Sequence, residues 1–251
     1  MDFNDFDFHG DLQSYFNRYI EYGGLPGVTE FSSQENMIPA YINGIYNTII
    51  MKDIIRRNDV RDPALLENII RFMAGNVGNL VSSKKISDYL TSSGRKTTNE
   101  TIDNYLRMFV DAYVLYRAGR YDLKGKQNLK TQGKYYIVDS GIRNQLVGKR
   151  GQDYGYVLEN IVYFELLRRG FTVKIGNISG QEVDFVATKM SKTIYYQVTA
   201  TMLSDETKER ELRPLRAIAD NYEKIVLSMD NTPMTDYEGI QSVNLLTFLM
   251  Q

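Results

Sequence analysis

Three side chains in the last hundred residues could bind a hard metal ion together. Glu159 lies in an apolar helical pattern, and Asp184 and Gln197 lie in two apolar stretches that are typical of strands. Carboxylate and amide oxygens, with the carbonyl oxygen of Val198 as a fourth ligand, suit Mg²⁺. Such an ion polarises a phosphodiester and lowers the pKa of a bound water. The pattern therefore predicts a phosphodiesterase-type site in which Glu159, Asp184 and Gln197 are both metal ligands and catalytic residues.

The alternation of side chains along strands decides whether these groups meet. Successive strand residues point to opposite faces, so Asp184 should face away from Val183 and Phe185, while Gln197 and Thr199 should share a face. We expect the carboxylates to converge in one pocket at the edge of a mixed sheet. The alternative is that an acidic residue in an apolar strand only caps a neighbouring loop.

A compact α/β unit must position these residues. A helical pattern ends at Arg168-Arg169-Gly170, where basic residues and a glycine are typical of a helix C-terminus. Three short strands, an amphipathic helix and two further strands are predicted after it, at 171–176, 182–188, 193–200, about 205–222, 224–229 and 240–244. The order αβββαβ with a final strand predicts one α/β domain over residues 151–251.

Two short helices joined by a tight turn are predicted before this domain. Ser82 or Ser83 caps the first, Ser93-Gly94 ends it, and Thr97 with Glu100 forms a capping box that opens the second. Two β-rich stretches follow and enclose the glycine- and lysine-rich segment 124–133. This arrangement predicts a winged-helix domain over residues 58–150.

The first 57 residues are predicted to be helical. A helical pattern from Asp11 ends at the glycine- and proline-rich turn 23–27. Ser32 with Glu35 is a capping-box signature for a long second helix, whereas His9 is interpreted as a solvated residue. The predicted fold class is α+β: a helical N-terminal region (1–57), a winged helix (58–150) and an α/β domain (151–251).

Composition excludes several kinds of chemistry. The chain has no cysteine, so it forms no disulfide, thiolate zinc site or cysteine nucleophile. It contains no G-x-x-x-x-G-K-[ST] loop, and we expect no ATP hydrolysis by this chain. With no apolar run of about 18 residues and no leader-like N-terminus, a cytoplasmic protein without membrane contact is expected.

Positive charge is concentrated in the middle of the chain. The net charge is −1, yet residues 117–150 hold nine basic and two acidic residues. This predicts a local anion-binding surface; the alternative is a solvated β-ribbon. The predicted nucleic-acid-binding residues are Lys84, Lys85, Arg95, Lys96, Lys124, Lys126 and Lys130. Because Glu100 and Asp103 on the second short helix repel phosphate, a protein-docking module stays an alternative.

Glu159, Asp184 and Gln197 resemble, in order and in predicted element, the motif of the PD-(D/E)xK phosphodiesterase superfamily. That motif is a helical Glu, a strand Asp, then Glu or Gln, one spacer and Lys, and Thr199 stands at the lysine position. The resemblance implies a restriction-endonuclease-like α/β fold. A neutral hydroxyl cannot supply the charge of the lysine, although Lys174 and Lys192 could substitute spatially.

Further motifs extend the resemblance over nearly the whole chain. Residues 22–27 (YGGLPG), 51–56 (MKDIIR), 134–139 (KYYIVD), 158–160 (LEN) and 182–185 (EVDF) resemble the C-terminal half of a large group of bacterial and archaeal AAA-type ATPases. In that group a P-loop module precedes a helical lid, a winged helix and a nuclease-like domain of unknown function. The resemblance implies that this chain is a C-terminal part of such an ATPase, and that ATP binds only to the N-terminal module.

The expected function is therefore a nucleic-acid-engaging or regulatory part of an AAA-type ATPase. Its PD-(D/E)xK site would be degenerate, with Mg²⁺ as the expected metal, DNA as the expected partner and little or no cleavage. Two alternatives stay open: an Mg²⁺-dependent DNA nuclease that uses a relocated lysine, and a protein-docking scaffold without nucleic-acid binding. The sequence does not predict the oligomeric state.

Overall fold

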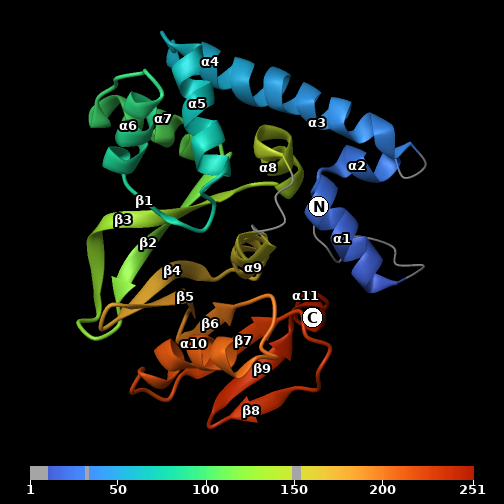
Figure 1. The fold of residues 1–251 in the computed structure, drawn as a ribbon, viewed down its shortest axis with the longest axis vertical. Coiled ribbons are helices and arrows are strands. Elements are labelled where there is room, and N and C mark those ends of the chain that lie inside the picture. Colours follow the sequence, from blue (N-terminus) through green and yellow to red (C-terminus); the bar gives the residue numbers. More distant parts are fainter. Residues whose placement is uncertain (1–10, 32–33, 149–153) are drawn as a thin grey trace. The chain divides into compact units, whose positions relative to one another are not determined.

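Two compact units make up the protein (Figure 1). The structure, a computed structural model, describes residues 11–31, 34–148 and 154–251. Unit 1 comprises residues 1–117 and 135–150, and unit 2 comprises 118–134 and 151–251. The sequence predicted three segments, with boundaries at residues 57 and 150. The two units also divide at residue 150, but they do not divide at residue 57, and residues 118–134 belong to the C-terminal unit. Nothing in the sequence indicated this assignment of residues 118–134.

Helices form most of unit 1. Asp11 caps the first helix, and Asp62 caps the helix that begins at Pro63, as expected from their residue types. The long helix predicted after Ser32 is a run of helical turns that includes a 3-10 turn (Glu35–Met37) and a π-helical turn (Tyr46–Met51). Ser32 itself, like His9, lies outside the described residues. The α-helices of unit 1 are α1 (Leu12–Tyr22), α2 (Pro26–Glu30), α3 (Ile38–Ile45), α4 (Lys52–Asn58), α5 (Pro63–Ala74), α6 (Ser83–Ser92), α7 (Asn99–Asp111) and α8 (Ser140–Val147).

The two short helices predicted in the middle of the chain are α6 and α7. The Ser82 hydroxyl accepts the Lys85 N–H at 3.2 Å and caps α6. Helix α7 is capped by Thr98, whose hydroxyl accepts the Thr101 N–H at 3.2 Å. The prediction of Thr97 as the cap was therefore wrong by one residue. Thr97 lies before the cap, and its carbonyl accepts a hydrogen bond from the Ser87 hydroxyl. Three strands accompany these helices in the order β1-β3-β2: β1 (Leu80–Val81), β2 (Leu115–Asp122) and β3 (Gln127–Ile137).

A buried aspartate joins the N-terminal turn to α8 within unit 1. Asp139 Oδ1 accepts the Ile142 N–H at 2.9 Å and caps α8, while Oδ2 accepts the Gly24 N–H at 2.8 Å. Gly23 has φ +78°, and a Cβ there would lie 2.2 Å from Asp139 Oδ1. The turn therefore requires glycine both for its backbone conformation and for the close approach of this carboxylate.

Unit 2 is built on a mixed sheet. Within it β2 is followed in the strand order by β4, β5, β6, β7, β9 and β8. Strand β5 runs antiparallel to both β4 and β6, whereas β6, β7 and β9 run parallel to one another. The predicted order αβββαβ and the final strand are present, and β8 and α11 are additional. The elements are α9 (Tyr154–Arg168), β4 (Thr172–Ile178), β5 (Gln181–Lys189), β6 (Lys192–Val198), α10 (Asp205–Arg216), β7 (Glu223–Ser228), β8 (Thr235–Tyr237), β9 (Ile240–Asn244) and α11 (Leu245–Leu249).

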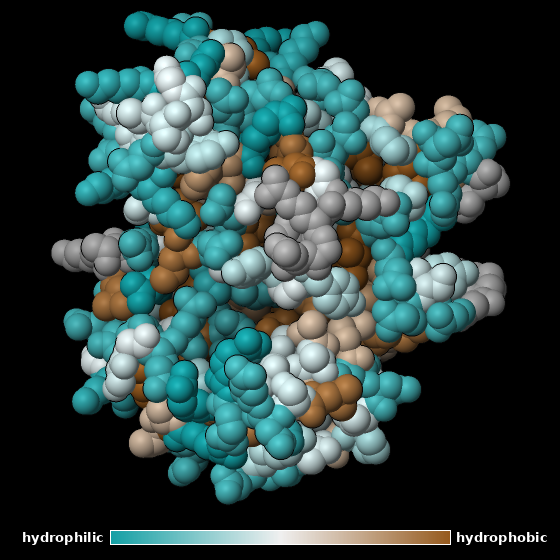
Figure 2. Space-filling model, viewed as in Figure 1, coloured by the Kyte–Doolittle hydropathy of each residue, from teal (hydrophilic) through white to brown (hydrophobic). Residues whose placement is uncertain are grey.

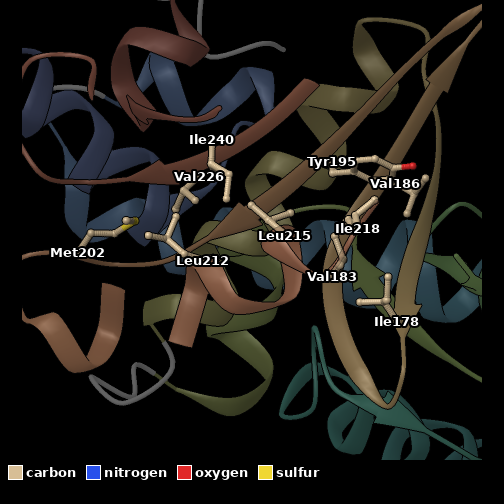
Figure 3. Close-up of a cluster of buried hydrophobic side chains, with 10 residues drawn as sticks. All are labelled: Ile178, Val183, Val186, Tyr195, Met202, Leu212, Leu215, Ile218, Val226 and Ile240. Atoms are coloured by element: carbon tan, nitrogen blue, oxygen red, sulfur yellow. The ribbon is translucent and has the colours of Figure 1, made fainter. Parts of the chain in front are cut away.

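Helix α10 covers an apolar cluster on one face of this sheet. Figure 3 shows Val186 and Tyr195 together at one end of the cluster and Met202 at the other. The neighbouring residue, Tyr196, instead packs its ring 5.8 Å from that of Phe248 in α11. Consecutive strand residues thus contact different helices, as the pleat of a strand requires.

The pairing of β4 with β5 is irregular. The register shifts between Lys174 and Gly176, so that two residues of β5 face one residue of β4. Val183 and Val186 both lie in the α10 cluster, whereas the Phe185 ring lies 6.0 Å from the Tyr163 ring of α9. The predicted orientation of Phe185, on the same face as Val183, is therefore wrong, because strict alternation does not hold across a bulge.

The described surface is mixed in polarity. On the face drawn in Figure 2, hydrophilic side chains predominate and hydrophobic ones are scattered between them. The most exposed large apolar residues, Met190, Leu203, Met234 and Tyr113, lie far apart in the sequence. None of the helices in the described residues has both the length and the apolar character needed to cross a bilayer.

Replacing Asp139 with alanine should lower the free energy of unfolding by roughly 2–3 kcal/mol, because a buried and a part-buried N–H group lose their acceptor. Asp62→Ala is the matched control: it removes an exposed helix cap and should cost about 1 kcal/mol. Urea denaturation of both variants measures the difference. Equal losses would show that the link from Asp139 to Gly24 adds nothing beyond a helix cap.

Candidate functional site

One lysine ammonium lies among three carboxylates in unit 2. Lys134 Nζ is 2.8 Å from Glu159 Oε1, 2.6 Å from Glu182 Oε1 and 4.0 Å from Asp184 Oδ1. The lysine comes from β3, one glutamate from α9, and the other two acids from β5, where they are two residues apart and so face the same way. Two strands and a helix thus bring together four titratable side chains from three separate parts of the sequence. We call these residues, Lys134, Glu159, Glu182 and Asp184, the Lys134 cluster.

The ammonium of Lys134 is buried and held in its charged form. Its side chain is 4 % exposed and that of Glu159 is 7 % exposed. Burial by itself would lower the pKa of Lys134, but attraction to Glu159, Asp184 and Glu182 outweighs burial and raises the pKa. The site therefore contains a permanent positive charge.

The carboxyl group of Asp184 has a raised pKa. Burial raises the pKa of its carboxyl group well above the ordinary value, and the negative charge of Glu159 adds to this. The Lys134 ammonium and the hydrogen bond from the Val198 N–H to Oδ2, at 2.8 Å, act in the opposite direction without cancelling the rise. A protonated carboxyl group is a poor metal ligand, because ligands bind metals in their deprotonated form.

Gln197 does not join the Lys134 cluster. Its Oε1 accepts the backbone N–H of Asp184 at 2.7 Å, and its Nε2 donates to Glu211 Oε2 in α10 at 3.0 Å. The register that pairs Phe185 with Tyr196 explains this, since the preceding residue of β5 then lies opposite Gln197. Of the three predicted ligands, the structure brings Glu159 and Asp184 to one ammonium, and Gln197 holds the backbone of Asp184 from the side of α10.

The residue at the lysine position of the PD-(D/E)xK motif, Thr199, is uncharged. Thr199 donates its hydroxyl proton to the carbonyl of Thr201, at 3.2 Å. The two lysines considered as substitutes have other contacts: Lys174 Nζ lies 5.0 Å from the centroid of the Tyr121 ring, and Lys192 pairs with Glu223. The positive charge at the carboxylates comes instead from β3.

Sequence reasoning missed Lys134 as a site residue, although a signal was present. Lys134 is two residues before Tyr136, which is fully buried, and the two therefore share a face of β3. A lysine in register with a buried aromatic residue needs a buried acidic partner, because an unpaired interior charge is too costly.

No metal centre is evident in the part of the chain that the structure describes. Within residues 11–31, 34–148 and 154–251, no three His, Cys, Asp or Glu side chains are arranged to hold a metal ion. The carboxylates of the Lys134 cluster surround an ammonium where a cation would otherwise bind. The Mg²⁺ ligand set Glu159, Asp184 and Gln197 stays a prediction.

The predicted nucleic-acid-binding residues occupy exposed positions in each unit. In unit 1, Lys84 and Lys85 are exposed on α6, and Arg95 and Lys96 are exposed in the turn before α7. Arg95 pairs with Asp62 at 3.3 Å across a solvent-exposed contact. In unit 2, Lys124 and Lys126 are exposed at the turn between β2 and β3, and the side chain of Lys130 lies outside the described ones.

A family model described as a domain of unknown function (DUF8612) matches residues 13–153, more than half of the chain. The chain belongs to this family. The match to the DUF8612 family includes Lys134 and ends shortly before Glu159, so the ammonium of the Lys134 cluster lies inside it and the carboxylates lie beyond it.

Two longer relatives extend the similarity beyond the DUF8612 match. An uncharacterized protein of Haemophilus influenzae is 39 % identical over 236 residues, which cover 94 % of this chain and 58 % of the relative. The uncharacterized protein MJ1544 of Methanocaldococcus jannaschii is 28 % identical over 231 residues, which cover 88 % of this chain and 48 % of the relative. The chain thus spans about half the length of these curated relatives. No solved structure matches the chain.

Lys134→Met should lower the free energy of unfolding by about 3–5 kcal/mol, because it leaves buried carboxylates without a counter-ion. The control is Lys192→Met, which removes an exposed pair with Glu223 and should cost about 1 kcal/mol or less. Urea denaturation at neutral pH gives both values. Similar small losses for the two variants would mean that the Lys134 ion pairs are not maintained in solution.

Asp184→Asn should remove a decline of stability with rising pH. The folded protein holds the Asp184 proton more tightly than the unfolded chain does, so this contribution is fully present below the ordinary aspartate pKa of about 4 and is lost as the pH rises through the raised pKa. A pKa that differs by one between the folded and unfolded states corresponds to about 1.4 kcal/mol.

A series of urea midpoints from about pH 4 to about pH 8 measures the contribution of Asp184. Relative to Asp184→Asn, the wild type should lose stability across this range, whereas Asp205→Asn on the surface should follow the wild type. A flat difference between wild type and Asp184→Asn would contradict the raised pKa.

Proposed function

We propose that this chain is a nucleic-acid-engaging or regulatory part of an AAA-type ATPase whose nuclease-like domain binds without cleaving. The observation that carries the proposal is the ammonium of Lys134 between Glu159, Glu182 and Asp184. A metal-dependent phosphodiesterase needs charged carboxylates with free oxygens to hold its ion. Here two carboxylates are ion-paired with a lysine, and burial raises the pKa of the third.

The order of elements supports the domain assignments. Glu159 on a helix, with Asp184 and Gln197 on adjacent strands of an αβββαβ unit, fits the resemblance to PD-(D/E)xK enzymes. The order α5, β1, α6, α7, β2, β3, with strand order β1-β3-β2, fits a winged helix. Both kinds of domain commonly contact nucleic acid, and winged helices use their second helix and their ribbon.

The role within a larger ATPase rests on the resemblance of five motifs. The relatives are longer than this chain, which leaves length for a further module such as a P-loop domain. The chain itself contains no phosphate-binding loop, so ATP would be bound and hydrolysed by that module. In this proposal the chain responds to the ATPase cycle and does not drive it.

Exposed basic side chains supply the nucleic-acid affinity. Lys124 and Lys126 lie at the tip of the β2–β3 hairpin, where they can reach a phosphate backbone without moving buried groups. Glu100 and Asp103 on α7 carry negative charge, so this helix is poorly suited to contact bases in the major groove. The Asp103 carboxylate accepts a hydrogen bond from the Ser83 hydroxyl. We therefore propose binding to the backbone with little sequence specificity.

A second candidate function uses the same lysine catalytically. Lys134 Nζ lies 4.0 Å from Asp184 Oδ1 and supplies the positive charge that Thr199 lacks. In an Mg²⁺-dependent nuclease the incoming ion would take over the carboxylates, and the ammonium would turn toward the transition-state phosphate. This candidate requires that a metal ion displace Lys134 from its ion pairs.

Incubation with supercoiled plasmid and Mg²⁺ or Mn²⁺ separates the two functions. We expect retarded migration of the plasmid in a native gel and no nicking after protein removal. Nicking that depends on the metal and is abolished in Lys134→Met would instead establish the nuclease.

DNA binding itself is measured by fluorescence anisotropy at increasing salt. Replacing Lys124, Lys126 and Lys130 by alanine should weaken binding, and on duplex DNA the salt slope should fall by about 0.9 for each phosphate that is no longer neutralised. Asp205→Asn serves as a surface control with unchanged affinity. No binding by the wild type at low salt would exclude nucleic-acid engagement and favour a protein-docking scaffold.

A further inference from the structure

A groove in unit 2 is lined by both tyrosines and lysines. It has a volume of about 600 Å³ and is formed by β2 and the turn after it, by β4, β5 and β6, and by the segment between α10 and β7. Its floor includes Val186 and Tyr195, which belong to the α10 cluster seen in Figure 3. The Lys134 cluster, by contrast, is built with Glu159 of α9. The groove is therefore separate from the nuclease-like site.

One carboxylate contacts two tyrosines of the groove, one through its hydroxyl and the other through its backbone. The Tyr195 hydroxyl donates to Asp220 Oδ2 at 2.7 Å, and the Tyr222 N–H donates to Asp220 Oδ1 at 3.1 Å. The two rings meet edge to face, with centroids 6.3 Å apart. Tyr222 is still 49 % exposed, so an aromatic ring that packs on Tyr195 is also accessible to a ligand.

The groove also carries an excess of positive charge. Lys126 and Lys174 line it against a single acid, Asp220, whose two oxygens already accept hydrogen bonds. Lys174 Nζ lies 5.0 Å from the centroid of the Tyr121 ring. This contact holds the ammonium on the groove wall, because cations are attracted to the face of an aromatic ring. An anionic group is thus favoured beside the tyrosines.

Aromatic rings and ammonium groups side by side suit a ligand that has both a flat ring and a negative charge. We infer that the groove binds a nucleotide unit, with the base stacked on Tyr222 and the phosphate near Lys174 and Lys126. Base stacking on aromatic residues combined with a basic track along the backbone is how proteins hold single strands. The inference rests on the proposed nucleic-acid function and names the site and the form of the ligand.

The test uses the full chain and a fluorescein-labelled oligothymidine of about 12 nucleotides, within the site sizes of single-strand binders. Tyr222→Leu and Lys174→Met should each weaken binding by about tenfold, as expected when a single base no longer stacks or a single phosphate is no longer paired. Two matched controls keep the wild-type affinity: Tyr222→Phe, which retains the ring, and Lys208→Met, which removes a lysine outside the groove lining. Urea midpoints verify that all four variants are folded.

The outcomes are distinguishable. If the wild type binds and the Leu and Met variants bind equally well, the groove is not the site, and the proposed function stands without it. If the wild type binds no oligonucleotide and no duplex, both proposals fail. AMP as a competitor distinguishes a free nucleotide from a strand as the ligand. If AMP displaces the oligonucleotide at concentrations similar to those of unlabelled oligonucleotide, the groove binds a free nucleotide. If much more AMP is needed, the groove binds a strand.

Discussion

The ion pairs of Lys134 are the interaction on which the C-terminal unit depends. A buried ammonium is tolerated only where acidic groups surround it, and this one has Glu159, Glu182 and Asp184 within 4.0 Å. To bring them together, the Lys134 side chain of β3 must meet that of Glu182 in β5, although β2 and β4 stand between these strands in the sheet, and α9 must present Glu159 to the same point. One charge thus constrains the arrangement of a helix and two strands.

The same charge decides what the site can do chemically. In a metal-dependent phosphodiesterase, an external cation neutralises the carboxylates and activates water. In this protein an internal cation pairs with them, and burial raises the pKa of Asp184. Gln197, which the motif assigns to the metal, connects the backbone of Asp184 to Glu211. The residues that resemble the phosphodiesterase motif therefore belong to a network of ion pairs and hydrogen bonds.

Local chemistry allowed much of the fold to be predicted. Asp62 before Pro63 and Ser82 before α6 begin helices where their side chains can accept free N–H groups, and the strands of unit 2 follow apolar stretches closely. Helix α8 was not predicted, because it has only eight residues and its position depends on its cap, Asp139, which also contacts Gly24, 115 residues away. Such a contact leaves no periodic signal in the sequence.

The candidate site was predictable only in part, for the same reason. The helical glutamate and the strand aspartate were identified from their types and elements, and the structure brings both to Lys134. The orientation of Phe185 was wrong because a bulge in the β4–β5 pairing breaks the alternation that the prediction assumed. Lys134 was missed because its acidic partners are 25 to 50 residues away, on a helix and on a strand that is not its neighbour in the sheet.

Anomalous scattering from crystals of the wild-type protein soaked in Mn²⁺ tests the role of Lys134 most directly. We predict no manganese peak between Glu159, Glu182 and Asp184, with the Lys134 ammonium in its place. A peak bonded to Glu159 and Asp184, with Lys134 displaced toward solvent, would contradict this prediction and would identify a working metal site.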